Sequence, residues 1–221
     1  MGNIKMTLIK NSFRWRSENK HWVDPFTCEP RWRNKVPIMN LIYRSSILLV
    51  VVLLSGCYSY ISPEASEKFN ARAAPFSVSV YPVNVIKPPG SIHPSIPMAE
   101  KVVTFLETEK LAKPVLVKER ALYDFVFSPN QTKIVANSAK AFAAQVSEAG
   151  IGTDYALLVE IMMLPNGEPG GVHYYLSDPK GEIADGSFTN DHWDEFKAVQ
   201  PKTAEDGYEV AIRMLRRTWG K

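Results

Sequence analysis

The chain has 221 residues, of which 45% are hydrophobic and 22% charged, so it is long enough for a folded domain and lacks the composition of a disordered or collagen-like chain. The formal net charge of +3 is unevenly distributed, because residues 57–221 hold 17 Lys and Arg against 20 Asp and Glu. Nucleic-acid binding needs a basic surface, so this slightly acidic part gives no electrostatic reason to expect a nucleic-acid partner.

The first 38 residues show no sustained hydrophobic period that predicts a helix or a strand. They contain Trp15, Trp22 and Trp32 together with several basic residues. Two interpretations are open: residues 1–38 form an N-terminal extension, cytoplasmic or part of a long targeting region, or translation starts at Met39. We favour the second, because a complete targeting sequence begins there.

Residues 39–56 contain the parts of an export signal peptide in the expected order. Arg44 supplies the positive charge, and the apolar run Ile47–Leu54 is too short to span a bilayer, which takes a helix of about 20 apolar residues. The run ends in Leu54-Ser55-Gly56-Cys57, and this tetrapeptide resembles the lipobox of bacterial lipoproteins. The alternative is a short buried helix or strand that a cysteine follows by chance.

The resemblance to lipoproteins implies cleavage between Gly56 and Cys57 and acylation of Cys57, so that the chain is anchored to a membrane through its lipid. Tyr58, and not Asp, follows the cysteine. By analogy with Gram-negative sorting, this residue favours the periplasmic face of the outer membrane if the host is Gram-negative. Cleavage also removes Cys28, which leaves no disulfide and no free thiolate for catalysis or for zinc.

The segment 57–75 is polar and rich in small residues, and it contains Pro63 and Pro75. This composition predicts a flexible tether between the lipid and the folded part of the chain. Residues 76–221 then form a single domain, of a size that buries about two-thirds of its unfolded surface.

The first half of this domain is predicted to open on a strand. Apolar residues alternate over Phe76–Val85 with a change of parity at Pro82, which predicts one strand with a break, at a sheet edge. Lys87–Pro97 is predicted as a loop, and Pro97 opens a helix. Two short strands are predicted next, at Val115–Val117 and Leu122–Phe127.

The second half begins with a long helix, which Asn130 is predicted to cap and Gly150 to end. Tyr155–Met163 is almost entirely apolar, which is typical of a central strand covered on both faces. A tight turn at Asp178–Gly181 joins two further strands, and Thr203 caps the final helix. These elements predict an α/β fold, with one mixed sheet and about three helices packed against it.

The sequence offers no recognisable catalytic or metal-binding motif. Three histidines of the mature chain, His93, His173 and His192, are too far apart in sequence for a zinc motif, so neither a metal nor a cofactor is predicted. His173 lies in a predicted strand and is interpreted as a surface or pocket residue. Five carboxylates are interpreted as a solvated face rather than as a catalytic pair: Asp178, Asp185, Asp191, Asp194 and Glu195.

One connecting segment mixes aromatic and hydrogen-bonding side chains, a combination that suits recognition. Its candidate binding residues are Asn190, Asp191, His192, Trp193 and Phe196. The alternative is a short helix that Asn190 caps, whose Trp193 and Phe196 cover the core. The sequence alone does not decide whether Trp193 is exposed.

The absence of catalytic motifs favours a membrane-anchored envelope lipoprotein with a non-catalytic binding or assembly role, whose partner is an envelope protein or polymer. Two other functions stay open. The first is a lipid-anchored hydrolase that acts on cell-wall material through its carboxylates and His192 or His173. The second is a structural subunit of an envelope secretion or transport apparatus.

The lipobox makes a direct prediction about the mature protein. Mass spectrometry of the membrane-extracted protein should find acylated Cys57 at its N-terminus, and Cys57→Ser should release the protein from the membrane because no acyl chain can be attached. Detection of an intact residue 1–56 segment in the mature protein, or membrane anchoring of Cys57→Ser, would contradict this prediction.

Overall fold

The computed structural model describes residues 60–72, 75–119, 121, 123, 125, 128 and 130–220. The predicted signal peptide, the N-terminal extension and Cys57 lie outside the described residues, as does most of the predicted strand Leu122–Phe127. Among the helices of the described part, none is long and apolar enough to cross a membrane.

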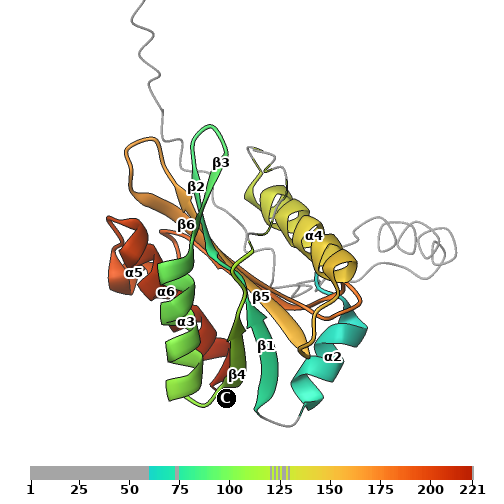
Figure 1. Ribbon diagram of the computed structural model, residues 1–221. Coiled ribbons are helices and arrows are strands. Elements are labelled where there is room, and N and C mark those ends of the chain that lie inside the picture. Colours follow the sequence, from blue (N-terminus) through green and yellow to red (C-terminus); the bar gives the residue numbers. More distant parts are fainter. Residues whose placement is uncertain are drawn as a thin grey trace, which may run out of the picture. The chain divides into compact units, whose positions relative to one another are not determined.

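Seven strands of the described part form one mixed sheet (Figure 1): β1 Phe76–Val80, β2 Val83–Lys87, β3 Ser91–Ser95, β4 Ala112–Leu116, β5 Tyr155–Met163, β6 Pro169–Ser177 and β7 Ile183–Thr189. β5 lies at the centre. It pairs with β6 in antiparallel fashion and with both β1 and β2 in parallel fashion. β4 pairs with β1, β3 pairs with β2, and β7 pairs with β6. The predicted central strand is therefore confirmed.

Helices cover both faces of this sheet. α3 (Ile96–Thr108), α5 (Asp194–Val199) and α6 (Ala204–Trp219) lie on one face, and α4 (Gln131–Ala149) lies on the other (Figure 1). The predicted apolar stripe of α4 packs against this face of the sheet. Its four side chains are fully buried: Val135, Ala139, Phe142 and Val146. This arrangement is the predicted α/β fold, a mixed sheet with helices packed against it.

The predicted helix ends are also confirmed. The Asn130 side chain accepts a hydrogen bond from the Lys133 N–H at 3.3 Å, and Gly150 ends α4 with a φ of 65°. Thr203 and Asp206 form a capping box at the start of α6, in which each side chain accepts a hydrogen bond from the backbone of the other. These local bonds explain why the helix limits could be predicted from sequence.

The break at Pro82 lies inside the sheet, so the prediction of an edge position is wrong. β1 and β2 pair with successive parts of the same side of β5, with Val80 opposite Leu157 and Asn84 opposite Glu160. Between these two pairs, the three residues 81–83 lie opposite only two residues of β5, 158 and 159. Such an extra residue is the geometry of a β-bulge. A bulge tolerates the missing N–H of Pro82 and explains the change of parity.

The predicted loop Lys87–Pro97 contains a strand. β3 pairs with β2 in antiparallel fashion, with Ser91 opposite Lys87 and Ser95 opposite Val83. β3 lies at an edge of the sheet and is mostly exposed, so it lacks the hydrophobic alternation by which strands are predicted. Pro94 is compatible with such an edge position.

Part of the predicted tether is folded against the domain. α2 (Pro63–Ala71) starts at Ser62, whose N–H donates to the Ile183 carbonyl of β7 at 2.8 Å. Phe69 is 3% exposed, and its ring contacts three other aromatic rings at centroid distances of 5.2–5.9 Å: Phe76, Tyr155 and Trp219. The folded domain therefore includes residues N-terminal to Phe76, and the prediction of a flexible tether is wrong for α2.

Replacement of Phe69 should show that α2 belongs to the domain. In a soluble form that starts at Tyr58, Phe69→Ala should lower the free energy of unfolding by about 3–5 kcal/mol, because it empties a large aromatic site. The exposed Glu67 of the same helix is the control, and Glu67→Ala should change stability by about 0.5 kcal/mol or less. Equal denaturant midpoints for the two variants would show that α2 does not stabilise the domain.

Candidate functional site

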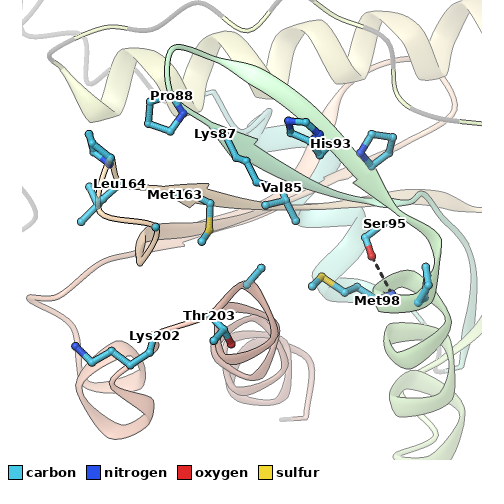
Figure 2. Close-up of a pocket in the computed structure, with 15 residues that line it drawn as sticks. Val85, Lys87, Pro88, His93, Ser95, Met98, Met163, Leu164, Lys202 and Thr203 are labelled. Carbon is cyan, nitrogen blue, oxygen red and sulfur yellow. Dashed lines mark hydrogen bonds between the residues drawn. The ribbon is translucent and has the colours of Figure 1, made fainter.

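An open groove of about 890 Å³ lies at the end of the sheet where the parallel strands β2 and β5 finish (Figure 2). Its walls come from the β2–β3 hairpin, the turn between β5 and β6, and the first residues of α3 and α6. The side chains that give it shape are Val85, Pro88, Pro94, Pro97, Met98, Met163, Leu164 and Pro165. We call this site the apolar groove.

Among the valine, leucine and methionine side chains of the groove, Leu164 is the most exposed, with 47% of its surface accessible. A tight turn holds it, since its N–H donates to the Glu168 carbonyl at 2.7 Å and its carbonyl accepts from the Gly167 N–H at 2.9 Å. Its side chain lies over Gly170, where an added Cβ would come within 2.5 Å of Leu164 Cδ2. Glycine at position 170 thus makes room for the leucine.

The ionisable side chains that line the groove all belong to basic residues: Lys87, His93 and Lys202. No carboxylate is among its lining residues. Lys202 forms an ion pair with Glu168 at 3.0 Å just outside the groove, and Lys202 itself is 69% exposed. The groove therefore combines an apolar floor with a basic rim.

The polar groups at the helix starts that face the groove already have partners. Ser95 Oγ accepts from the Met98 N–H at 3.4 Å, as Figure 2 shows. The Asp206 carboxylate accepts from the Lys202 and Thr203 N–H groups at 2.8 Å each, and these hydrogen bonds lower its pKa. Because Glu205 and Asp206 place negative charge in the first turn of α6, this helix end does not favour the binding of a further anion.

A second depression of about 510 Å³ shares Leu164 and Lys202 with the apolar groove and extends towards α5. Asp191 and Phe196, two of the predicted binding residues, line it. The segment that sequence analysis selected therefore borders the groove without forming its centre.

The structure separates the predicted binding residues by exposure. The side chains of Asp191 and His192 are 75% and 82% exposed and lie 3.6 Å apart, whereas Phe196 is only 6% exposed and packs in the core. Trp193 is 38% exposed, with its ring against Phe188 at a centroid distance of 6.2 Å. Asn190 is half-buried and donates to the Gln131 side chain at 3.0 Å.

The alternative interpretation of this segment is confirmed for the short helix, which is α5, and for Phe196, but it is wrong for the cap. Asn190 does not cap α5, because the N-cap position is Trp193, which makes no side-chain capping bond. Phe196 is buried in the core, whereas Trp193 lies at the edge of the core and is partly exposed. Phe196 is accordingly a structural residue, while Asp191, His192 and Trp193 are available to a partner.

His173 is fully buried, so its interpretation as a surface or pocket residue is wrong. It lies opposite Glu160 on the paired strands β6 and β5, and Tyr175 bridges the two side chains. The Tyr175 hydroxyl donates to Glu160 Oε2 at 3.0 Å and lies 3.2 Å from His173 Nδ1. All three side chains are 0% exposed, so this cluster does not reach a substrate in the described conformation.

Three of the five predicted surface carboxylates support the fold. Asp185 accepts from the Tyr174 hydroxyl at 2.9 Å and from Trp219 Nε1 at 2.7 Å. Asp178 accepts from two N–H groups of its own turn, and Glu195 pairs with Arg217. Within the described residues, no group of three or more His, Cys, Asp or Glu side chains is arranged to hold a metal ion.

No family model and no curated protein matches this chain. Among solved structures it is similar to the LpoB C-terminal domain from Salmonella enterica, with 19% identity and a TM-score of 0.31, over 57% of this chain and 91% of that chain. The LpoB C-terminal domain from Escherichia coli gives 19% identity and a TM-score of 0.30, over 57% and 90% of the two chains. A functional proposal for this chain therefore has to be argued from its own residues and not from these structures.

The apolar groove was not predicted from the sequence, because its residues come from segments as distant as Val85 and Ala204. One local signal was present. Leu164 precedes Pro165-Asn166-Gly167, a turn sequence between two apolar strands, where a large apolar residue has no core to enter.

The different surroundings of Trp193 and Phe196 predict different effects on stability. Phe196→Ala should lower the free energy of unfolding by about 3–5 kcal/mol, because it leaves a cavity in the core. Trp193→Ala should cost about 1 kcal/mol, because the ring is partly in water and contacts one neighbouring ring. Chemical denaturation of both variants measures the difference, and a loss at Trp193 as large as that at Phe196 would make Trp193 a core residue.

Proposed function

We propose that this protein is a membrane-anchored envelope lipoprotein whose domain binds a segment of a protein partner in the apolar groove. The observation that carries this proposal is the groove itself, an open apolar surface with the exposed Leu164 at its side. Methionine and leucine side chains adapt to different apolar partners, and Met98 and Met163 both line the groove. The anchor rests on the lipobox at Leu54–Cys57.

The chemistry of the groove specifies the partner further. A basic rim without carboxylates favours a segment that carries Asp or Glu next to apolar residues. A polysaccharide would need many hydrogen-bonding groups. The Ser95 and Thr203 hydroxyls of the groove, however, already bond within their own helix caps. A protein segment is thus favoured over an envelope polymer.

The hydrolase alternative finds no support in the geometry of the described residues. His173 is enclosed with Glu160 and Tyr175, and His192 is paired with the exposed Asp191 outside any tight cluster of acids. Catalysis by acid and base needs both groups within reach of one bound substrate. The non-catalytic binding role therefore remains the proposal.

Site-specific photocrosslinking in living cells tests this proposal. A photoreactive amino acid is placed in the full chain at Leu164, inside the groove, and at Val115 as the control, an apolar residue on β4 that is 54% exposed. The Leu164 position should give a discrete protein adduct and the Val115 position none, because apolar exposure alone does not create a site. The crosslinked partner peptide, sequenced by mass spectrometry, should contain acidic and apolar residues.

Two substitutions check the chemistry of the contact in the same assay. Lys87→Glu should reduce the Leu164 adduct severalfold, since it reverses a rim charge without touching the core. Gly170→Ala should also reduce it, because the new Cβ occupies the space over which the side chain at position 164 lies. Equal adducts from Leu164 and Val115, or an adduct insensitive to both substitutions, would overturn the groove as the binding site.

A further inference from the structure

The chain is packed against the domain from Tyr60 onwards, only three residues after the predicted acylation site. Tyr60 packs against β7 and β6, since a Cβ added at Gly186 would lie 3.0 Å from its ring, and its ring centroid is 6.3 Å from that of Tyr175. Burial raises the pKa of the Tyr60 hydroxyl. Two residues later, Ser62 bonds to the β7 backbone at Ile183 and its hydroxyl donates to Glu182 at 3.1 Å.

Only three peptide steps separate Tyr60 from Cys57. Three extended residues span at most about 11 Å. The tether predicted from sequence, residues 57–75, would have allowed the domain to move several times farther from its anchor. The length of the segment from Cys57 to Tyr60 therefore limits how far the β7 side of the domain can lie from the acylated cysteine.

We propose that the anchored protein holds the β7 edge of its sheet, with Tyr60 and α2, against the lipid surface of the membrane. This inference rests on the acylation of Cys57 in the proposed function. The occupant of this face is the bilayer itself, because the acyl chains must lie within it and the fixed chain begins about 11 Å from their attachment point. The domain is held beside the membrane and does not range freely from it.

The sheet then determines where the apolar groove stands. β3 and β4 lie four strand spacings from β7, across β6, β5 and the β1 and β2 pair. At about 4.8 Å per spacing, this is on the order of 19 Å. The β3 wall of the groove, with His93 and Pro94, is thus on the side of the sheet away from the anchor. A partner segment must reach the groove at this height above the lipid.

Charge does not hold this face to the membrane. The charged side chains of α2 and its C-cap are balanced, with Glu64 and Glu67 against Lys68 and Arg72, and Glu64 pairs with Lys68 at 2.7 Å. A basic face would be attracted to anionic lipid and released by salt. The position of the domain should therefore not depend on ionic strength.

Short-range quenching in vesicles tests the proposal with the full lipidated protein. The mature chain has no cysteine besides Cys57, so Glu64→Cys and Lys113→Cys each give one labelling site, near the anchor and on the far strand β4. Labelled protein is reconstituted into phosphatidylethanolamine and phosphatidylglycerol vesicles that carry nitroxide headgroups. The label at position 64 should be quenched several times more than that at position 113, at low and at high salt.

A lengthened tether provides the matched control. Insertion of about 20 Gly and Ser residues between Tyr58 and Ser59 adds a chain that spans on the order of 25 Å, and it should reduce quenching at position 64 to the level at position 113. Equal thermal midpoints of the native and the lengthened protein are the check that the insertion leaves the domain folded.

The outcomes separate this inference from the proposed function. Protein that floats with the vesicles, with equal quenching at both positions in the native chain, would overturn the fixed placement and leave the lipid anchor intact. Failure of the native protein to float, with an unacylated N-terminus in its mass spectrum, would overturn both.

Discussion

The central strand β5 is the constraint on which the rest of this structure depends. It is hydrogen-bonded along both sides, and from Tyr155 to Ile161 it is buried on both faces. Its register with β2 sets Val85 opposite Ile161, and its last residue, Met163, leads into the turn that holds Leu164. The walls of the apolar groove are thereby fixed by the most buried part of the domain.

Buried polar groups next to β5 make its pairing specific. Glu160 and His173 are cross-strand partners and both face α4, with Tyr175 between them. A slip of one residue would turn Glu160 towards the opposite, apolar face, where no such partners lie. The cost of burying a carboxylate is large unless it is hydrogen-bonded, so only the observed register keeps this group satisfied at Oε2. Register and groove geometry therefore depend on the same contacts.

The features predicted correctly from sequence have local causes. The caps at Asn130 and Thr203 are formed within one turn, and the apolar run Tyr155–Met163 shows its own burial. The features missed depend on partners distant in the chain. α2 has one large apolar anchor, Phe69, whose aromatic partners lie up to 150 residues later. The burial of His173 follows only once α4 covers its face of the sheet.

A groove built on rigid elements constrains how a partner binds. β2, β5, α3 and α6 all pack on the same core, so the groove exists before a ligand arrives, and binding need not order its walls. If the lipid also holds the β7 edge near the membrane, both the shape and the height of the site are fixed. In the complex proposed above, the adaptable element is then the partner, which has to supply an exposed segment long enough to reach the groove. If both proteins are bound to the envelope, as the proposed function has it, affinity comes from their high local concentration as well as from the contact itself.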